Sequence, residues 1–98
     1  MFVKIIKSYR DVVTICDNEL LNKKFEEGEF QLDLKENFYK GEELNEEETL
    51  SIIKKMSRED ATFNIVGKKS IETAIKSEII SEKDIKTIQG IPYSLVLL

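Results

Sequence analysis

The chain has 98 residues, 41% of them hydrophobic, and a formal net charge of −4, with one cysteine and no histidine. This length and hydrophobic fraction indicate a single packed domain over residues 1–98 rather than a disordered chain. Without histidine the chain cannot hold a Ser-His-Asp or Cys-His catalytic arrangement, and its lone Cys16 can form neither an internal disulfide nor a zinc cluster.

The charge is spread unevenly along the chain. Residues 1–24 carry five bases and three acids, residues 25–60 five bases and twelve acids, and residues 61–98 five bases and four acids. The chain therefore lacks the strongly basic footprint of a nucleic-acid-binding domain, and no DNA contact is predicted. No apolar run approaches the roughly 18 residues of a membrane span, so we expect a soluble, cytoplasmic protein without membrane contact.

Two β-rich runs open the chain. Residues 1–8 alternate between two faces and residues 12–16 are mostly β-branched, so both runs predict strands. The short polar break between them predicts a hairpin. Cys16 ends the second run and is expected to be a small buried hydrophobic residue, since no histidine is present to activate its thiol.

A short helix is predicted over residues 18–26. Asp17, just before it, is a good N-cap. Leu21 and Phe25 lie four residues apart, as on one helical face, and Gly28 follows as a stop.

Residues 30–34 alternate apolar and polar side chains and give the clearest one-sided strand pattern in the chain. Residues 35–43 are predicted as a loop that turns at Gly41. Phe38 and Tyr39 in this loop are expected to pack against the body of the domain.

Residues 46–57 predict an amphipathic helix. Asn45 and Glu48 have the spacing of a capping box. Acids fill the first turn and bases the last turns, as the helix dipole favours. The acidic middle of the chain is therefore explained as a solvated helix start rather than a metal site, because adjacent carboxylates on a helix point in different directions.

The last third of the chain alternates strands and helices. Residues 61–66 predict a strand, and a helix follows from residue 68. A capped turn at Ser81 precedes two further β-like runs at residues 85–89 and 91–98. The order of elements predicts the α+β class, with a mixed or antiparallel sheet and two to three helices. The apolar final residues are expected to dock, either as a strand of the sheet or against a partner.

The stretch Gly67-Lys68-Lys69-Ser70 raises the question of phosphate binding. A phosphate loop needs Gly-x-x-x-x-Gly-Lys-Ser/Thr, whereas Thr62 stands where the first glycine belongs and two lysines precede the serine. An ATPase-type loop is therefore excluded, but free N–H groups at a helix start could still hold an anion. The alternative is that the glycine only allows the turn from strand to helix and that the lysines face solvent. The candidate anion-binding residues are Asn64, Gly67, Lys68, Lys69 and Ser70.

A second candidate surface could bind RNA or a protein partner. Basic side chains of the first strand and the first helix would gather if these elements lie together, and Tyr9 and Tyr93 could offer stacking surfaces. The alternative is an ordinary charged surface, because the chain carries 15 bases that must lie somewhere. The candidate residues are Lys4, Lys7, Arg10, Lys23, Lys24 and Tyr93. The sequence singles out no catalytic residue, no cofactor and no metal ligand.

Several short motifs recur in a known family. They are Cys16-Asp17-x-Glu19-Leu20-Leu21, Phe25-Glu26-Glu27-Gly28, Phe38-Tyr39-x-Gly41, Asn64-x-Val66-Gly67 and Gly90-x-Pro92. Through them nearly the whole chain resembles the archaeal domain-of-unknown-function 424 family, whose members are small proteins without an assigned activity. The resemblance implies an archaeal cytoplasmic origin and a compact α+β fold, and it carries over no catalytic residues. It also favours a link to translation, with the ribosome, RNA or a translation protein as partner.

Three hypotheses of function follow. The lack of catalytic signatures favours a non-catalytic binding or adaptor protein, associated with translation or a ribonucleoprotein. The alternative is a small anion- or nucleotide-binding protein, or an enzyme, that uses the helix start at residues 67–70. In the third hypothesis the apolar residues Leu95–Leu98 mediate self-association, and the oligomeric state stays open.

Overall fold

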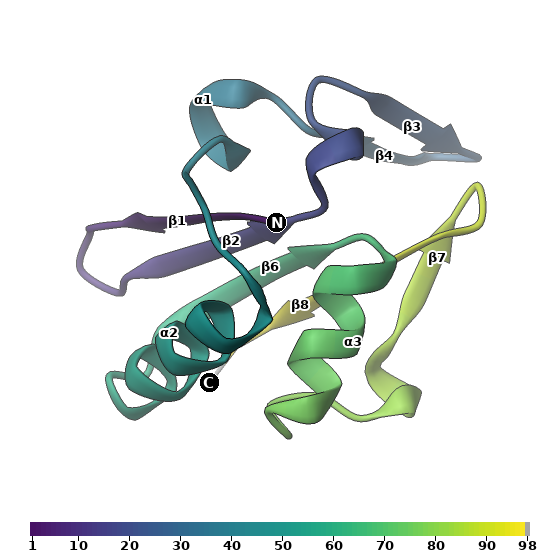
Figure 1. Cartoon of the computed structure of the whole chain (residues 1–98). Coiled ribbons are helices and arrows are strands. Elements are labelled where there is room, and N and C mark those ends of the chain that lie inside the picture. The colour runs from purple at the N-terminus through teal and green to yellow at the C-terminus, as the bar shows by residue number, and fades with distance from the viewer. Residues whose placement is uncertain (98) are drawn as a thin grey trace.

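A mixed six-stranded sheet lies at the centre of residues 1–97, the residues that the computed structural model describes (Figure 1). Leu98, the last residue of the run predicted as a final strand, lies outside the described residues. The strand order is β5-β1-β2-β6-β8-β7, in which β2 and β6 run parallel and the other neighbours run antiparallel. The strands are β1 Phe2–Ile6, β2 Val12–Cys16, β5 Glu42–Glu43, β6 Thr62–Val66, β7 Lys86–Ile88 and β8 Ile91–Val96.

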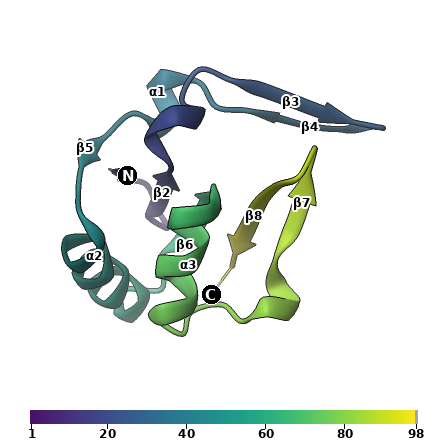
Figure 2. The same cartoon turned by 45° about the vertical axis from the view of Figure 1, so that its right-hand side comes forward.

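Two helices cover one face of this sheet (Figures 1 and 2). They are α2, Glu46–Arg58, and α3, Lys68–Lys76. The main hydrophobic core lies between them and the sheet, with Phe63 among its fully buried members. α2 begins where the sequence predicts, because Asn45 and Glu48 form both hydrogen bonds of a capping box.

The opposite face of the sheet is covered at one end. A 3₁₀ turn η1 (Asn18–Leu20), the short helix α1 (Glu36–Tyr39) and a hairpin of β3 (Lys24–Glu27) and β4 (Phe30–Asp33) lie over that end (Figure 1). They enclose a second, smaller core against the sheet. The buried members of this second core are Cys16, Leu20, Leu34, Tyr39 and Val66.

The predicted helix over residues 18–26 is wrong. The single turn η1 forms, and Lys24–Glu27 is the first strand of the hairpin instead. Phe25 pairs with Leu32 across the hairpin, so both side chains share one face and pack against the second core together. The helical spacing of the apolar residues is a local signal, and burial against a strand from later in the chain overrides it. Gly28 lies in the hairpin turn rather than at a helix end.

The predicted loop over residues 35–43 is wrong in part, since it contains α1 and the two-residue strand β5. Tyr39 is buried as expected, whereas Phe38 stays 36% exposed. Gly41 crosses the edge of β1 at very close range, because a Cβ atom there would lie 2.1 Å from the carbonyl oxygen of Val3. A glycine is therefore required at this crossing.

The other predicted elements are confirmed, and so is the α+β class. β1 and β2 form the predicted hairpin, β6 leads into α3, and β7 and β8 are the two late strands. Ser81 and Asp84 cap the turn η2 (Glu82–Asp84) with reciprocal hydrogen bonds. α3 begins where the sequence predicts, at Lys68, and ends at Lys76. None of the helices within residues 1–97 is long and apolar enough to cross a membrane.

Candidate functional site

The sheet face opposite α2 and α3 has an uncovered part. Residues that pair across neighbouring strands lie on the same face, so the register assigns each strand residue to one face. At the end of the sheet nearest the β1–β2 turn, six residues of this face are partly or largely exposed. We call them the open shelf: Ile6, Val12, Thr62, Asn64, Leu95 and Leu97.

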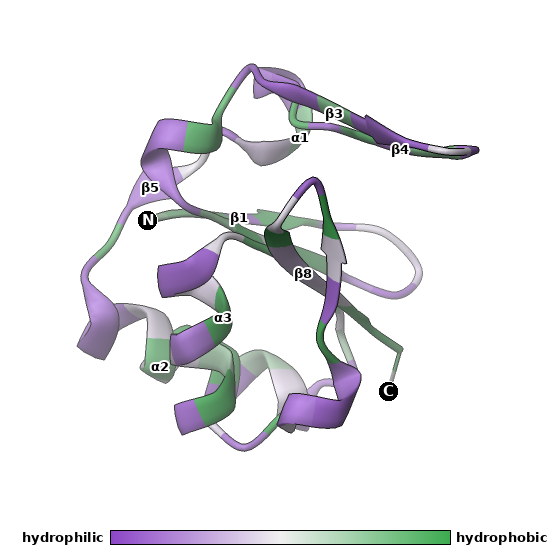
Figure 3. Cartoon of the chain, turned by 90° about the vertical axis from the view of Figure 1, so that its right-hand side faces the viewer, coloured by the Kyte–Doolittle hydropathy of each residue, from purple (hydrophilic) through white to green (hydrophobic). Residues whose placement is uncertain are grey.

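The open shelf is apolar where it is most exposed. Leu95 and Leu97 expose 57% and 71% of their surface. Figure 3 shows the end of β8 toward the C-terminus as hydrophobic. Ile6 and Val12 extend the apolar surface onto β1 and β2. Contiguous exposed apolar patches of this kind mark interaction sites in soluble proteins.

α1 forms the boundary of the open shelf. Thr14 of β2 is fully buried and donates a hydrogen bond from its hydroxyl to the carbonyl oxygen of Phe38, at 3.1 Å. Lys4 donates from Nζ to the carbonyl oxygen of Asn37, at 2.6 Å. These contacts fix α1 on the sheet and hold the Lys4 ammonium group at the border of the shelf.

Two bases and one acid lie at the described strand positions of this face, and the acid, Glu43 of β5, lies opposite Phe2 at the covered end. Lys4 and Lys86 are the charged residues among the described positions of β1, β2, β6, β7 and β8 that share the face of the shelf. Asp11, next to the shelf in sequence, is already engaged. Its carboxylate accepts hydrogen bonds from Lys7 and from the Ser8 N–H, at 3.2 and 3.3 Å, and these bonds lower its pKa.

A carboxylate of the chain itself occupies the helix start where an anion is predicted to bind. Asp17 Oδ2 accepts a hydrogen bond from the backbone N–H of Lys69, at 3.0 Å. Its Oδ1 accepts from the backbone N–H and the hydroxyl of Ser70, at 2.8 and 2.7 Å. Asp17 is 3% exposed and Ser70 is fully buried. We call this set of contacts the Asp17 latch; it satisfies two helix-start N–H groups and complements the helix dipole.

The Asp17 latch changes what the start of α3 offers to a ligand. The two N–H groups that donate to Asp17 are not free to hold an external anion. Asn64 lies on the open shelf, on the face of the sheet opposite α3, so it does not come together with the exposed Lys68 and Lys69. Gly67 makes the turn between β6 and α3, with φ 108°. Anion binding at the predicted residues stays a prediction, in which the anion competes with Asp17.

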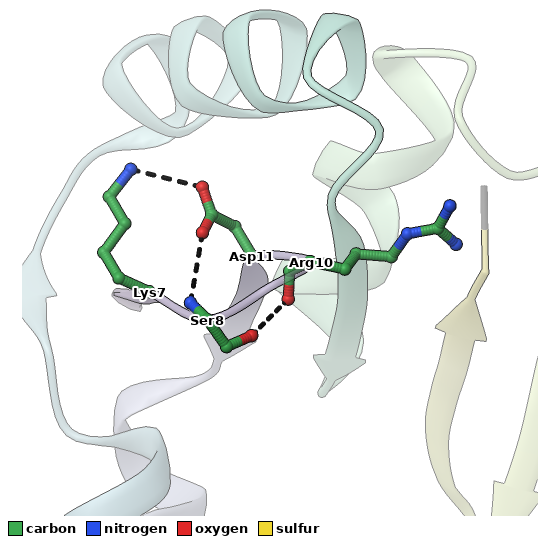
Figure 4. A network of polar contacts seen from close by, with 4 residues as sticks. All are labelled: Lys7, Ser8, Arg10 and Asp11. Atoms are coloured by element: carbon green, nitrogen blue, oxygen red, sulfur yellow. Dashed lines mark hydrogen bonds and ion pairs between the residues drawn. The ribbon is translucent and has the colours of Figure 1, made fainter.

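The bases of the predicted RNA surface lie at opposite ends of β2. Lys7 and Arg10 belong to the β1–β2 turn, and Figure 4 shows their side chains pointing in opposite directions. Lys7 forms an ion pair with Asp11. Lys23 and Lys24 lie at the start of the β3–β4 hairpin, which follows the other end of β2.

The remaining two residues of the predicted RNA surface lie on the shelf side of the sheet. Lys4 is at the shelf border, and Tyr93 is half-buried against the second core. The Tyr93 ring is therefore only partly accessible for stacking. The structure does not bring all six residues into one basic patch, and RNA contact stays a prediction.

Cys16 is a buried core residue, as the sequence predicts. Burial raises the pKa of its thiol to about 12, with a further contribution from the negative charge of Asp17. Burial likewise raises the pKa of Tyr39 to about 12. Both groups are therefore neutral at pH 7, and the thiol lacks the thiolate character that a nucleophile needs.

We expect the free energy of unfolding to fall as the pH rises above about 9. The unfolded thiol ionises near its ordinary pKa of about 8.5, whereas the folded thiol keeps its proton up to about 12. Ionisation thus favours the unfolded state, by up to about 1.4 kcal/mol per pH unit for this group. Cys16→Ala should remove most of this slope between about pH 9 and 10, before Tyr39 contributes. Urea unfolding across this range measures it, and equal slopes in both proteins would contradict the assignment.

Two features escaped the sequence interpretation. Asp17 is a helix cap, as its residue type suggests, but the helix that it caps begins about fifty residues later, since Asp17 and Ser70 are 53 positions apart. The sequence predicts no function for three residues of the open shelf, Ile6, Val12 and Thr62. The alternation of side chains along a strand assigns each of them to one face of the sheet but does not reveal which face stays uncovered. The apolar run at the end of the chain was the one available signal for the shelf.

Comparisons with known proteins agree on family and fold. Residues 6–98 match the family model described as "Protein of unknown function (DUF424)". The chain is also similar to the crystal structure of an uncharacterized conserved protein from Methanopyrus kandleri, with a TM-score of 0.87 and 19% sequence identity. That match covers 97% of this chain and 88% of the other, and at this identity it shows the fold alone. None of the curated proteins compared with the sequence matches it.

Proposed function

The chain belongs to the DUF424 family of proteins of unknown function, and from this premise we propose that it is a non-catalytic adaptor that holds another protein on its open shelf. The observation that carries the proposal is the exposure of Leu95 and Leu97, 57% and 71%, on one face of the sheet. Fully burying one exposed leucine contributes about 1.5–3 kcal/mol, so these two side chains could supply much of a binding free energy.

The open shelf is a preformed surface. β2 and β6, which carry three of its six residues, each have a paired strand on both sides. α1 is fixed at the border by the hydrogen bonds of Thr14 and Lys4. A partner would therefore meet ordered side chains, and little binding free energy would be lost to ordering the shelf.

We expect the partner to be a protein of the ribosome or of the translation apparatus, a context that comes from the family resemblance given above. A protein is favoured over RNA because the shelf presents leucines. Proteins bind single-stranded RNA with several basic side chains together with accessible aromatic rings. Lys4 and Lys86 are the two bases on this face, and Tyr93 is half-buried.

Leu95→Glu is expected to reduce partner capture more than tenfold, because a charge in the apolar centre of an interface removes the burial of the leucine and buries a carboxylate. The stability of the variant should stay within about 0.5 kcal/mol of the parent, since the side chain is 57% exposed. Tagged protein is incubated with an archaeal lysate, and captured proteins are identified and quantified by mass spectrometry. Phe30→Glu is the matched control, because Phe30 is 71% exposed on the distant β3–β4 hairpin.

The same experiment separates the alternatives. A protein that is captured equally by the parent and by Leu95→Glu would overturn the proposal. Loss of capture after ribonuclease treatment would point to RNA instead, and sucrose-gradient sedimentation shows whether the partner is ribosomal. Light scattering addresses self-association, since a dimer that becomes a monomer on Leu95→Glu would mean that a second copy covers the shelf.

A further inference from the structure

We infer that the element bound on the open shelf is a single amphipathic helix whose apolar stripe is flanked by acidic residues. This inference rests on the proposed function and names the chemistry of the partner. It follows from three properties of the shelf, namely its paired backbone, its width and its charge.

The backbone beneath the centre of the shelf is paired on both sides. Beside the shelf, β7 pairs with β8 only at Ile91–Tyr93 among the described residues, so a strand added to the outer edge of β8 beyond Tyr93 would lie next to the shelf and would not cover it. β2 and β6 lie inside the sheet, so their backbone N–H and C=O groups pair with neighbouring strands on both sides. An extended segment laid on this face would find side chains rather than backbone partners, and its own N–H and C=O groups would stay unsatisfied where they are buried. A helix satisfies its backbone internally and can pack by side chains alone.

The width of the shelf fits one helix. Along the strands it runs over three residues, from Thr62 to Asn64 on β6 and from Leu95 to Leu97 beside it. Three strand residues cover about 10 Å, which is close to the 10–12 Å diameter of a helix with its side chains. α1 closes one side of this strip, so the helix must run across the strands. The four strands from β1 to β8 span about 14 Å, or about nine helical residues.

The charge of the shelf selects an acidic helix. Lys4 lies at the β1 end of the face and Lys86 at the β7 end. The one acid at the described strand positions of this face is Glu43 of β5, which lies opposite Phe2 at the covered end of the sheet and accepts a hydrogen bond from Asn18. The Lys4 ammonium group donates a hydrogen bond to the carbonyl oxygen of Asn37, which is neutral and leaves the charge of Lys4 uncompensated by that contact. Two bases beside an apolar strip complement acidic residues beside an apolar stripe, and they disfavour a basic helix.

Two designed peptides test the inference. Both are 15-residue helices with the same leucine stripe, and the remaining positions are glutamate in one and lysine in the other. The acidic peptide should bind at least tenfold more tightly than the basic one, and should shift the amide resonances of residues 62–64 and 95–97 in NMR titrations of the full chain. The chain has a net charge of −4, so long-range attraction favours the basic peptide, and the opposite preference must come from the shelf.

Charge reversal provides the control. Lys4→Glu with Lys86→Glu should lower the affinity for the acidic peptide at least tenfold and raise that for the basic one. Lys54→Glu with Lys55→Glu makes the same change of net charge at exposed positions of α2. This control should leave the ratio of the affinities for the acidic and the basic peptide unchanged. Equal binding of both peptides, a preference insensitive to Lys4 and Lys86, or no binding of either peptide would overturn the inference. If that happens while Leu95→Glu still abolishes capture of a cellular protein, the adaptor proposal stands and only the acidic helix falls.

Discussion

Asp17→Ala is expected to lower the free energy of unfolding by about 3–4 kcal/mol, because it removes an N-cap and leaves buried donors without an acceptor. The carboxylate accepts three hydrogen bonds, from the N–H groups of Lys69 and Ser70 and from the Ser70 hydroxyl. Asp17 is 3% exposed and Ser70 is fully buried, so water cannot readily replace the lost acceptor. Urea unfolding followed by circular dichroism measures the change.

Two further substitutions make the Asp17 result specific. Asp17→Asn keeps an acceptor for Ser70 but turns an amide N–H₂ group toward the Lys69 N–H, so an intermediate loss is expected. Asp33→Ala removes a partly exposed carboxylate that lies 3.8 Å from the ammonium group of the exposed Lys35, and it should cost no more than about 0.5 kcal/mol. A loss for Asp17→Ala as small as that for Asp33→Ala would mean that the Asp17 latch contributes little to stability.

Gly67→Ala is expected to destabilise the fold by at least about 3 kcal/mol, since backbone strain and a steric clash act together. Gly67 has φ 108°, which L-residues rarely adopt, and a Cβ atom there would lie 2.3 Å from Cγ of Asp17. Gly28→Ala is the matched control: φ is 61° and no atom lies within 4 Å of the added Cβ, so strain alone should cost about 1–2 kcal/mol. The same urea measurement compares the two.

Asp17→Ala and Gly67→Ala should also be coupled in their effects on the free energy of unfolding. In the Asp17→Ala background the Cγ and Oδ2 atoms, which would lie 2.3 and 2.5 Å from the new Cβ atom, are gone. The contact with the Cβ atom of residue 17, at 2.7 Å, and the strain of φ 108° at Gly67 remain. Gly67→Ala should therefore cost at least about 1 kcal/mol less in that background than in the parent, a non-additivity expected of residues in contact. Strict additivity would show that the contact with the Asp17 carboxylate does not account for the need for glycine, which would then come from backbone strain and from the Cβ atom of residue 17.

Elements with a strong local pattern could be predicted from the sequence. α2 has its capping box and its acidic first turn within a few residues of Asn45, and the structure contains both capping hydrogen bonds. β1 and β2 alternate and are joined by a short polar turn, so their hairpin forms from neighbours in the chain. In each case the residues that decide the element lie inside it or next to it.

The segment over residues 18–26 shows where local reasoning fails. The spacing of its apolar residues suits a helix. In the structure Phe25 instead pairs with Leu32 across the hairpin, and both side chains pack against the second core. The open shelf could not be predicted from the sequence for a related reason. Which face of β8 stays open depends on where α1 lies, and α1 is held there by contacts of Thr14 and Lys4 on other strands.

The sequence by itself determined the fold class, the burial of Cys16 and the capped α2. The tertiary structure alone decided that Asp17 caps α3 and that Leu95 and Leu97 lie on an open face. The physical reason is the distance along the chain over which each interaction acts. Periodicity and capping act over one or two turns of chain, whereas the Asp17 latch joins residues 53 positions apart and exists only after β2 and β6 pair.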